Sequence, residues 1–489
     1  MSSKLDTLLQ AYTEYERTLP FQWLPEGSSL ESLATFGSNR QKPVDGWFHF
    51  KEGFSSDLLN YVLNLIPLNQ SQTIRLLDPF AGVGTSILAA QRARNEGWIF
   101  EAIGVERNPF LEFVARTKLL WPLLDLNRLI QLEEQILDPP LSTSEFQGDI
   151  PALTTIHNSM VFSNRRLRHL LALRERIKNR ADVCPQERDF LLLGYAAILE
   201  RLSGVRKDGR ALRFVRRTGR PSVKKVLAQQ WHAMRADLMR LSEEKDVNHA
   251  RMYLGDARNL RVLGLRDRSF DLILYSPPYL NNIDYTEVYK LETWMLEFIT
   301  TYDEFRAQRQ KTIRSHPSIR FELTDWLDRS DNAATAKALR DALIDVWPEE
   351  CRGWRTRLVS GYMDDMLKCL QEQYRVAKDG AYIVCVVGNS FHLRMPYKVP
   401  VATDLLIAAL AQSVGFDIEE VQAIRHLHRR DGQERRFLRE SLILMQKPTS
   451  CVPDFAQRYG RATHGLAGKY EVVGRHGLAE IVSGQQGRL

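Results

Sequence analysis

The sequence predicts an α/β protein built on a doubly wound sheet, and three observations indicate this fold class. Residues 74–90 read as a short apolar strand, a glycine-rich turn and the start of a helix. A second apolar run ends at Glu106, and a third, residues 271–275, stops at two prolines. Short apolar strands that lead through tight turns into helical patterns are typical of such sheets.

The length and composition are those of a globular protein with several packed units. Of the 489 residues, 44% are hydrophobic and 26% are charged, and at roughly 100 to 200 residues per domain we expect two to four units. The longest apolar stretch, residues 190–199, has about half of the roughly 20 residues that a membrane-spanning helix needs. The N-terminus carries charges where a secretory signal needs an apolar core. We therefore expect a cytoplasmic protein with no membrane partner.

The cysteines predict neither a disulfide framework nor a metal site. There are five, which are widely spaced and form no CxxC pair. Zinc sites and small disulfide-rich folds instead show closely and regularly spaced cysteines. The sequence also contains no recognisable cluster of a metal-dependent nuclease. We expect reduced cysteines and no bound metal.

The first strand and turn, IRLLDPFAGVGTSILAA, form a candidate cofactor site. Gly82 and Gly84 would let a ligand approach the backbone closely, and the helix that follows offers free N–H groups at its start. About 20 residues further on, Glu106 ends the next apolar run, where an acid can accept hydrogen bonds from a ribose diol. The two features together are typical of a site for an adenosine-bearing cofactor. The glycine pattern alone would also fit a purely structural turn.

The strand over residues 271–275 ends in Ser276, Pro277, Pro278 and Tyr279. Proline cannot continue a central strand, so this turn must project from the carboxyl end, the edge at which open α/β sheets bind ligands. The Ser276 hydroxyl, the carbonyl beside Pro277 and the Tyr279 ring would then be exposed to a ligand. The alternative is a rigid Pro-Pro turn beneath an aromatic lid.

Positive charge is concentrated in residues 201–225. This segment holds ten basic residues and a single acid, Asp208, which gives a net charge of +9, whereas the whole chain carries +7. Such a concentration predicts a polyanionic partner, because basic side chains displace condensed counterions from phosphates. A solvated loop is the alternative. The predicted nucleic-acid contacts are Arg206, Lys207, Arg210, Arg213, Arg216, Arg217 and Arg220.

These motifs resemble a known family. LLDPFAGVGT is similar to the cofactor motif, and YSPPY to the catalytic motif, of the S-adenosylmethionine-dependent amino-methyltransferases of DNA, which modify cytosine N4 or adenine N6. The SPPY form is typical of the cytosine-N4 group. WFHFKEGFSSDLLNYVLNLI resembles the family's N-terminal motif, and KDGAYIVCVVGNS and RESLILMQK resemble its later strands. The resemblance implies a Rossmann-like doubly wound methyltransferase sheet with helical insertions.

The resemblance also implies roles for individual residues. S-adenosylmethionine would be held by Asp78, Pro79, Phe80, Gly82, Gly84, Thr85, Glu106 and Asp256. The catalytic residues would be Ser276, Pro277, Pro278 and Tyr279. The Ser276 hydroxyl and the Pro277 carbonyl would accept the hydrogens of the target amine while Tyr279 stacks on the base. Duplex DNA buries that amine, so the base would be flipped out. The absence of a Pro-Cys pair disfavours methylation of cytosine C5, which needs a cysteine nucleophile.

The motifs divide the chain into seven expected segments. They are an N-terminal extension (1–46), the cofactor half of the methyltransferase domain (47–124), a basic helical insertion (125–250), the catalytic half (251–299), a helical insertion rich in tryptophan (300–360), the C-terminal strands (361–447) and a tail (448–489). In the first insertion we predict a helix that is capped by Ser163 or Asn164, and a later helix with a core stripe from Val223 to Leu238. Both insertions are candidates for target recognition.

The predicted function is site-specific methylation of double-stranded DNA at the exocyclic amine of a flipped base, with cytosine N4 as the target. Three alternatives stay open: methylation of adenine N6, methylation of a base amine in RNA, and a non-catalytic DNA-binding protein that keeps a degenerate methyltransferase fold. Intact DPFAGVGT, Glu106 and SPPY argue against the last. The function is compatible with a separately encoded restriction or defence partner.

Overall fold

The computed structural model describes residues 2–449, with gaps at 26–27, 139–145, 147, 149, 151–157, 209–210, 217–218, 220, 245, 281–282, 320, 348, 395–396 and 428–434. Three of the predicted nucleic-acid contacts, Arg210, Arg217 and Arg220, therefore lie outside the described residues. The same holds for the predicted tail from residue 450 onward.

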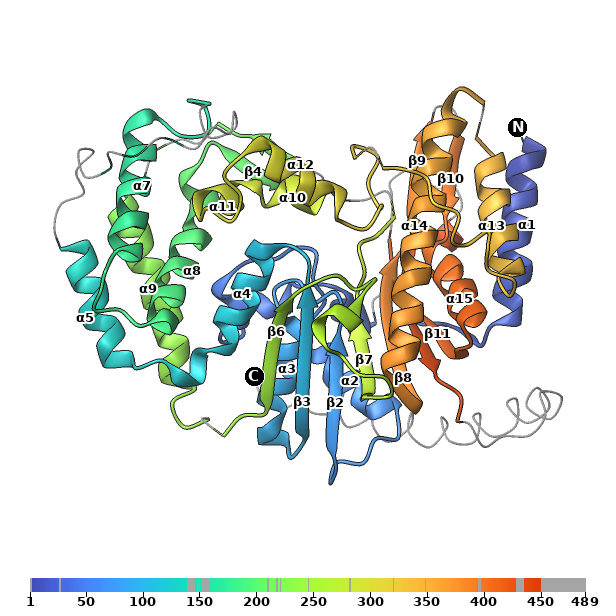
Figure 1. Ribbon diagram of the computed structural model, residues 1–489, viewed down its shortest axis with the longest axis horizontal. Helices are drawn as coiled ribbons and strands as arrows, with labels where there is room; N and C mark the ends of the chain where they lie inside the picture. Colours follow the sequence, from blue (N-terminus) through green and yellow to red (C-terminus); the bar gives the residue numbers. More distant parts are fainter. Residues whose placement is uncertain are drawn as a thin grey trace, which may run out of the picture. The chain divides into compact units, whose positions relative to one another are not determined.

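An eight-stranded sheet forms the centre of the described part of the chain, with the strand order β1-β11-β12-β8-β7-β2-β3-β6 (Figure 1). The strands are β1 (Phe21–Trp23), β2 (Thr73–Asp78), β3 (Ile99–Glu106), β6 (His249–Leu254), β7 (Phe270–Tyr275), β8 (Ala377–Gly388), β11 (Asp417–His426) and β12 (Arg439–Gln446). Strand β12 runs antiparallel to both of its neighbours, and the other neighbouring pairs are parallel. The predicted fold class, a doubly wound α/β sheet with helical insertions, is confirmed.

The strand order reverses between β2 and β7. From β2 the chain continues to β3 and β6 on one side, whereas from β7 it continues to β8 on the other. A crevice for a ligand forms outside the carboxyl ends of the strands at such a reversal. The two motifs that the sequence singles out, after β2 and after β7, lie on either side of it.

Successive side chains of the central strands point to opposite faces of the sheet and pack into two separate cores. Leu272 and Leu274 of β7 belong to one core, which also receives α2 (Asp57–Leu65), α3 (Thr85–Arg92) and α4 (Pro109–Leu119). Ile273 and Tyr275 belong to the other, which receives α1 (Ser2–Thr18), α13 (Ala334–Asp345), α14 (Glu349–Val376) and α15 (Thr403–Val414). Both faces of the sheet are therefore covered by helices, as the doubly wound class requires.

The residues that precede the first motif are part of this architecture. Strand β1 pairs in parallel with β11 at the edge of the sheet. Behind it, the fully buried Arg439 donates to Glu16 of α1 at 2.6 Å and to Asp404 of α15 at 2.7 Å. Because each of these charges has a partner, the cluster can stay buried. This cluster connects α1, near the start of the chain, and α15 to strand β12.

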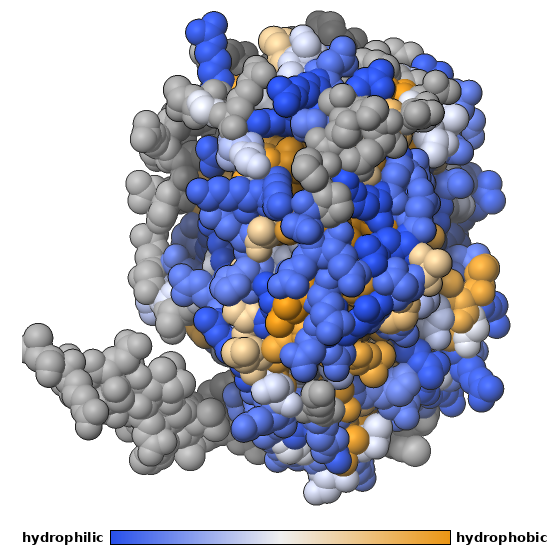
Figure 2. Space-filling model, turned by 90° about the vertical axis from the view of Figure 1, so that its left-hand side faces the viewer, coloured by the Kyte–Doolittle hydropathy of each residue, from blue (hydrophilic) through white to orange (hydrophobic). Residues whose placement is uncertain are grey.

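The first insertion is a group of helices packed beside α4 (Figure 1). It contains α5 (Leu126–Leu137), α7 (Asn164–Lys178), α8 (Pro185–Leu202), a hairpin of β4 (Val205–Asp208) and β5 (Ala211–Phe214), and α9 (Val223–Arg240). Both predicted helices are confirmed: α7 follows its N-cap Ser163, and the stripe of α9 from Val223 to Leu238 is buried. Hydrophilic residues cover most of the face that Figure 2 shows on this side.

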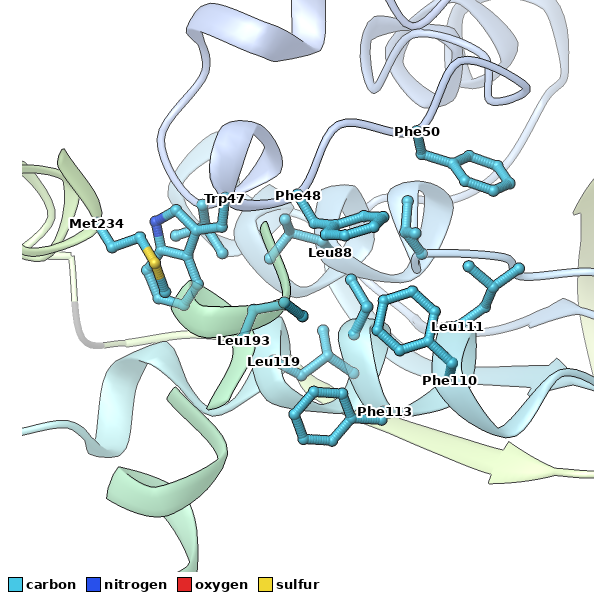
Figure 3. Close-up of a cluster of buried hydrophobic side chains, with 14 of the residues drawn as sticks. Trp47, Phe48, Phe50, Leu88, Phe110, Leu111, Phe113, Leu119, Leu193 and Met234 are labelled. Atoms are coloured by element: carbon cyan, nitrogen blue, oxygen red, sulfur yellow. The ribbon is translucent and has the colours of Figure 1, made fainter. Parts of the chain in front are cut away.

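The insertion shares its core with the sheet. Met234 of α9 and Leu193 of α8 lie in one cluster with Trp47, Phe48 and residues of α3 and α4, as Figure 3 shows. Trp231 of α9 is fully buried, and its ring N–H donates to the carbonyl of Leu191 at 3.2 Å. The helices of residues 126–240 are thus attached to the sheet through a continuous apolar core.

The remaining elements are short. They are α10 (Tyr285–Val288), α11 (Lys290–Met295), α12 (Tyr302–Gln310), the hairpin of β9 (Ser390–Arg394) and β10 (Tyr397–Val401), and 3-10 turns at Ser29–Ala34, Ser38–Gln41, Asp45–Trp47, Ala93–Glu96, Trp121–Leu123, Leu260–Leu263 and Arg435–Phe437. Among the described residues, no helix is both long and apolar enough to cross a membrane. The same residues contain no cluster of His, Cys, Asp and Glu suited to a metal ion.

Candidate active site

A pocket opens at the carboxyl ends of β2, β3, β6 and β7. From these strand ends it is lined by Pro79, Phe80, Ala81, Gly82, Val83, Thr85, Glu106, Arg107, Asn108, Gly255, Asp256, Ala257, Ser276 and Pro278. Its other walls come from the segment before α2, from α10 and the residues before it, and from the segment after α12. The structure therefore joins the glycine turn, Glu106 and the SPPY turn in one cavity, at the edge where this class of sheet binds ligands.

The two glycines of the first turn have different roles. Both have left-handed backbones, with φ of +53° at Gly82 and +80° at Gly84, which side-chain-bearing residues rarely adopt. A Cβ on Gly82 would lie 3.3 Å from the ring of Phe50, on the pocket side. A Cβ on Gly84 would lie 2.9 Å from the Cβ of Ala115 in α4. Gly82 thus faces the ligand space, whereas Gly84 lets the turn pack closely on α4.

Glu106 is held by backbone N–H groups at the tip of β3. Its Oε2 accepts from the N–H of Gly82 at 2.8 Å and its Oε1 from the N–H of Asn108 at 2.7 Å. Burial raises the pKa of Glu106, and these backbone donors act in the opposite direction. A carboxylate can accept about four hydrogen bonds, so Glu106 keeps the capacity to accept from a ligand in the pocket.

Asp78 and Gly84 were predicted to bind the cofactor, but neither lines the pocket. Asp78 is buried behind the turn, where it accepts from the N–H of Phe80 at 2.9 Å and from the hydroxyl of Ser86. Burial raises its pKa to about 7. Asp78 and Gly84 therefore shape the turn behind the pocket, and their contact with a cofactor stays a prediction.

Asp256 lines the pocket within a network of charges. Its two oxygens accept from Nε and Nη2 of Arg258 at 3.0 and 2.8 Å, and Arg258 also pairs with the buried Asp365 of α14 at 3.0 Å. Burial raises the pKa of Asp256, but the hydrogen bonds and charge of Arg258 outweigh it, so the pKa lies below its ordinary value. Asp256 is therefore a charged residue of the wall whose oxygens are already partly occupied.

The SPPY turn projects from β7 as predicted, but its residues are not equally placed. Ser276 and Pro278 line the pocket, and the Ser276 hydroxyl donates to the Tyr279 hydroxyl at 3.3 Å. Pro277 is buried, and Tyr279 is half-buried outside the pocket lining. The ring of Tyr279 lies against Gly388 at the end of β8, where an added Cβ would be 2.6 Å from its Cε2.

The expectation of a freely exposed Tyr279 ring is therefore wrong for this arrangement. The reason is the close approach of β8, because Gly388 leaves room for the ring to pack there. Tyr279 also hydrogen-bonds to Glu440 of β12, which is buried and pairs with Arg425 at 2.8 Å. Contacts with β8 and β12 thus hold the Tyr279 side chain of the SPPY turn in place.

Several wall residues were not predicted. Phe50, Glu52 and Phe54 line the pocket, and Glu52 accepts from the hydroxyl of Tyr289 at 2.6 Å. They lie in the stretch that resembles the family's N-terminal motif, so a signal was present. Asp284 also lines the pocket and accepts from Arg309 at 2.6 Å. No sequence signal pointed to it.

A further wall comes from the second insertion. Residues of the segment that follows α12 line the pocket, among them Lys311, Thr312, Ile313 and His316. The sequence contained no signal for this contact, because the segment is brought to the pocket only by the fold.

The basic segment does not present all of its charge to solvent. Arg206, Arg213 and Arg216 are exposed. Lys207 is buried: its Nζ lies 2.5 Å from the carboxylate of Glu292 and 4.8 and 4.5 Å from the rings of Phe48 and Tyr289. Alternation along β4 turns the Lys207 side chain inward, so it is not exposed in this structure, and its contact with nucleic acid stays a prediction.

The fold and the site define a class: a doubly wound α/β sheet with helical insertions and a pocket where its strand order reverses. In sequence, the chain is similar to proteins named type II methyltransferases. The chain is 23% identical over 497 residues to the type II methyltransferase M.AvaI of Nostoc sp. and to that of Anabaena variabilis, covering 92% of this chain and 96% of each relative. It is also 23% identical over 472 residues to the type II methyltransferase M.BsoBI of Geobacillus stearothermophilus, covering 85% of this chain and 88% of that protein.

Other comparisons add little. No family model matches the chain. Among solved structures, the rRNA methyltransferase aviRa from Streptomyces viridochromogenes is similar with a TM-score of 0.29 and 11% identity, covering 86% of this chain and 94% of that chain. A score this low supports no conclusion about fold or function.

Proposed function

We propose that this chain is a type II DNA methyltransferase that transfers a methyl group from S-adenosylmethionine to the exocyclic amine of a flipped base, with cytosine N4 as the target. The observation that carries the proposal is the single pocket that joins Gly82 and Glu106 to Ser276 of the SPPY turn. The similarity to type II methyltransferases along 92% of the chain supports it. The first residue of SPPY favours cytosine N4 over adenine N6, through the resemblance described above.

The residues of the pocket fit the proposed cofactor. Glu106 offers oriented acceptor lone pairs to a ribose diol, and Gly82 leaves space beside them. Phe50 and Phe80 provide apolar walls for an adenine ring, and Asp256 supplies a charged wall near it. When bound, S-adenosylmethionine would supply an electrophilic methyl group on a sulfonium.

The chemistry of the protein's own residues centres on Ser276. The amine of a base is a poor nucleophile because its lone pair is delocalised into the ring. Since the Ser276 hydroxyl donates to Tyr279, its oxygen lone pairs remain available to accept a hydrogen of the amine. This hydrogen bond would localise the lone pair of the amine and orient it for attack. Pro278, Ile283 and Tyr285 would exclude water from the same space.

We propose separate roles for the hydroxyl and for the ring of Tyr279. Its hydroxyl fixes the direction of the Ser276 hydroxyl. The stacking of the ring on a flipped base stays a prediction, because the ring lies outside the pocket lining. Stacking would need the ring to move away from Gly388 by a change in the SPPY turn.

The proposed substrate is double-stranded DNA, and we assign target recognition to the insertion over residues 125–250. Its exposed Arg206, Arg213 and Arg216 support contact between this insertion and DNA. A separately encoded restriction or defence partner stays part of the proposal. The seven-segment division of the chain stays part of the proposal.

The proposal is tested by transfer of a labelled methyl group to duplex DNA in a single turnover. Ser276→Ala should reduce the transfer rate by on the order of 100-fold, as expected for a lost general acid-base contact, while affinities for cofactor and DNA stay near parental. The matched control is Ser71→Ala, an exposed serine before β2 at the opposite edge of the sheet. Transfer by Ser276→Ala at the rate of the control would exclude SPPY as the catalytic turn. Transfer by the parent to RNA alone would replace DNA as the substrate.

A further inference from the structure

A second cavity lies outside the pocket, between the first turns of α7 and α9. It is a groove lined by Arg165, Arg166, His169 and Lys224, with Ser163 and Ser222 at the two helix starts. None of the residues that line it is acidic. The groove therefore brings basic side chains from two segments, about 60 residues apart in sequence, to one concave surface.

Hydrogen bonds hold Arg166 of the groove in place, whereas Arg165 and Lys224 are exposed. Arg166 donates to the carbonyl of Leu202 at 2.9 Å and to that of Pro221 at 3.1 Å, so its guanidinium spans from α7 to the end of α8 and to the turn before α9. Arg165 and Lys224 are exposed, and within the described residues no hydrogen bond or ion pair is recorded for either. Like charges on one concave surface repel one another, and an anion in the groove would relieve this repulsion.

The β4–β5 hairpin carries a second pair of cations next to the groove. Arg206 and Arg213 are directly opposite each other in the antiparallel register, and both are exposed. Like charges at directly opposite positions destabilise a hairpin, and Asp208, 3.0 Å from Arg213, balances only one of the two. This arrangement is expected where a polyanion supplies the missing negative charge.

The groove and the hairpin are joined, and the hairpin leads to the pocket. The N–H of Gly204, just before β4, donates to the carbonyl of Val161, just before α7, at 2.7 Å. Strand β5 packs against α10, whose Tyr285 and Thr286 line the pocket. Figure 1 shows β4 between α7 and α10. The buried pair of Lys207 and Glu292 holds the hairpin to α11. The hairpin that carries Arg206 and Arg213 therefore contacts both the segment before α7 and the α10 wall of the pocket.

We infer that the groove binds a backbone phosphate of duplex DNA and that Arg206 and Arg213 contact the same backbone nearer to the pocket. The inference rests on the proposed function, because it takes the substrate to be DNA. It adds a contact site made by Arg165, Arg166, His169 and Lys224, all of which lie outside the strongly basic hairpin. Such contacts would carry no sequence information and would instead set the register of the duplex on the protein.

The test uses the full chain with Arg165 and Lys224 both changed to Gln, which removes two charges and leaves Arg166 to hold the helices together. A matched control changes Arg266 and Lys4 to Gln. These are also exposed, but they lie before β7 and in α1, away from the groove. Binding of a labelled duplex is measured at several salt concentrations, and thermal unfolding checks that each variant is folded.

The groove variant should bind duplex DNA more weakly, and its slope of log affinity against log salt should be shallower by about 1.8, or roughly 0.9 for each of two lost phosphate contacts. The control should keep the parental slope. A groove variant with the slope of the control would overturn the inference and leave the proposed function intact. A parent that binds no duplex DNA, or that binds only RNA, would overturn both.

Discussion

The buried ion pair of Lys207 and Glu292 allows a quantitative prediction, because its two partners are almost completely removed from water. Their side chains are 6% and 1% exposed, and Nζ lies 2.5 Å from Oε1. Lys207→Met keeps a side chain of similar length over the rings of Phe48 and Tyr289 but leaves the Glu292 carboxylate buried without its partner. Breaking one side of such a pair costs about 3–5 kcal/mol. We therefore expect the free energy of unfolding at pH 8 to fall by about that amount.

The double variant Lys207→Met with Glu292→Gln separates the charge from the packing. It removes both charges, so most of the lost stability should return. The loss should also depend on pH. Burial raises the pKa of Glu292, and the charge of Lys207 opposes this, so the carboxyl in the single variant has a still higher pKa. A folded-state pKa above the unfolded value stabilises the protein at low pH, and this stability is lost as the pH rises through the folded pKa.

Chemical denaturation of the parent, the single variant and the double variant at pH 5.5 and pH 8 provides the measurement. The cost of Lys207→Met should be smaller at pH 5.5 than at pH 8. A single variant as stable as the parent, or a double variant no more stable than the single, would contradict this prediction. Because Lys207 is buried, the folded double variant should also bind DNA with the parental salt dependence. A shallower dependence would mean that Lys207 does reach phosphate.

Three further predictions concern the pocket. Gly82→Val places a side chain against Phe50 at a backbone with φ of +53°, so calorimetric titration should detect no binding of S-adenosylmethionine to a folded variant; unchanged affinity would sink the cofactor assignment. Gly388→Ala puts a Cβ 2.6 Å from Cε2 of Tyr279 and should slow single-turnover transfer by roughly 100-fold through misplacement of the turn. Its control, Gly353→Ala, where a Cβ meets nothing within 4 Å, should transfer at the parental rate, and equal rates for both variants would contradict the role of Gly388. Burial raises the pKa of Asp78 to about 7. As the pH rises from 4 to 7, the parent should therefore lose stability relative to Asp78→Asn, by on the order of 1.4 kcal/mol per pH unit at most. A difference in unfolding free energy that does not change with pH would contradict this prediction.

The parts of the fold that depend on patterns within a few neighbouring residues could be predicted from the sequence. A strand followed by a glycine turn, and a strand stopped by two prolines, are patterns within a few residues, and they located β2, β7 and the edge of the sheet that holds the pocket. The apolar stripe of α9 and the cap of α7 are local in the same sense. Glu106 was predictable because it ends a strand at a characteristic distance after the glycine turn.

The parts that depend on contacts between distant segments could not be predicted. The direction of Lys207 follows from the register of the β4–β5 hairpin, and its partner Glu292 lies 85 residues away. The position of the Tyr279 ring depends on Gly388 of a strand that follows an insertion. Strand β1 pairs with β11 through Phe21 and Val421, and nothing in either segment alone indicates the other. The charge pattern alone therefore could not show that the Lys207 side chain is buried.

The proposed methylation of cytosine N4 at the pocket between β2 and β7 is tested most directly by sequencing the modified bases in DNA from a host that expresses this chain. We expect N4-methylcytosine at one recurring sequence, absent from the same host expressing Ser276→Ala and present with Ser71→Ala. N6-methyladenine at a recurring sequence would contradict the proposed base. DNA without any new modified base, from cells that contain the folded protein, would contradict the proposed activity.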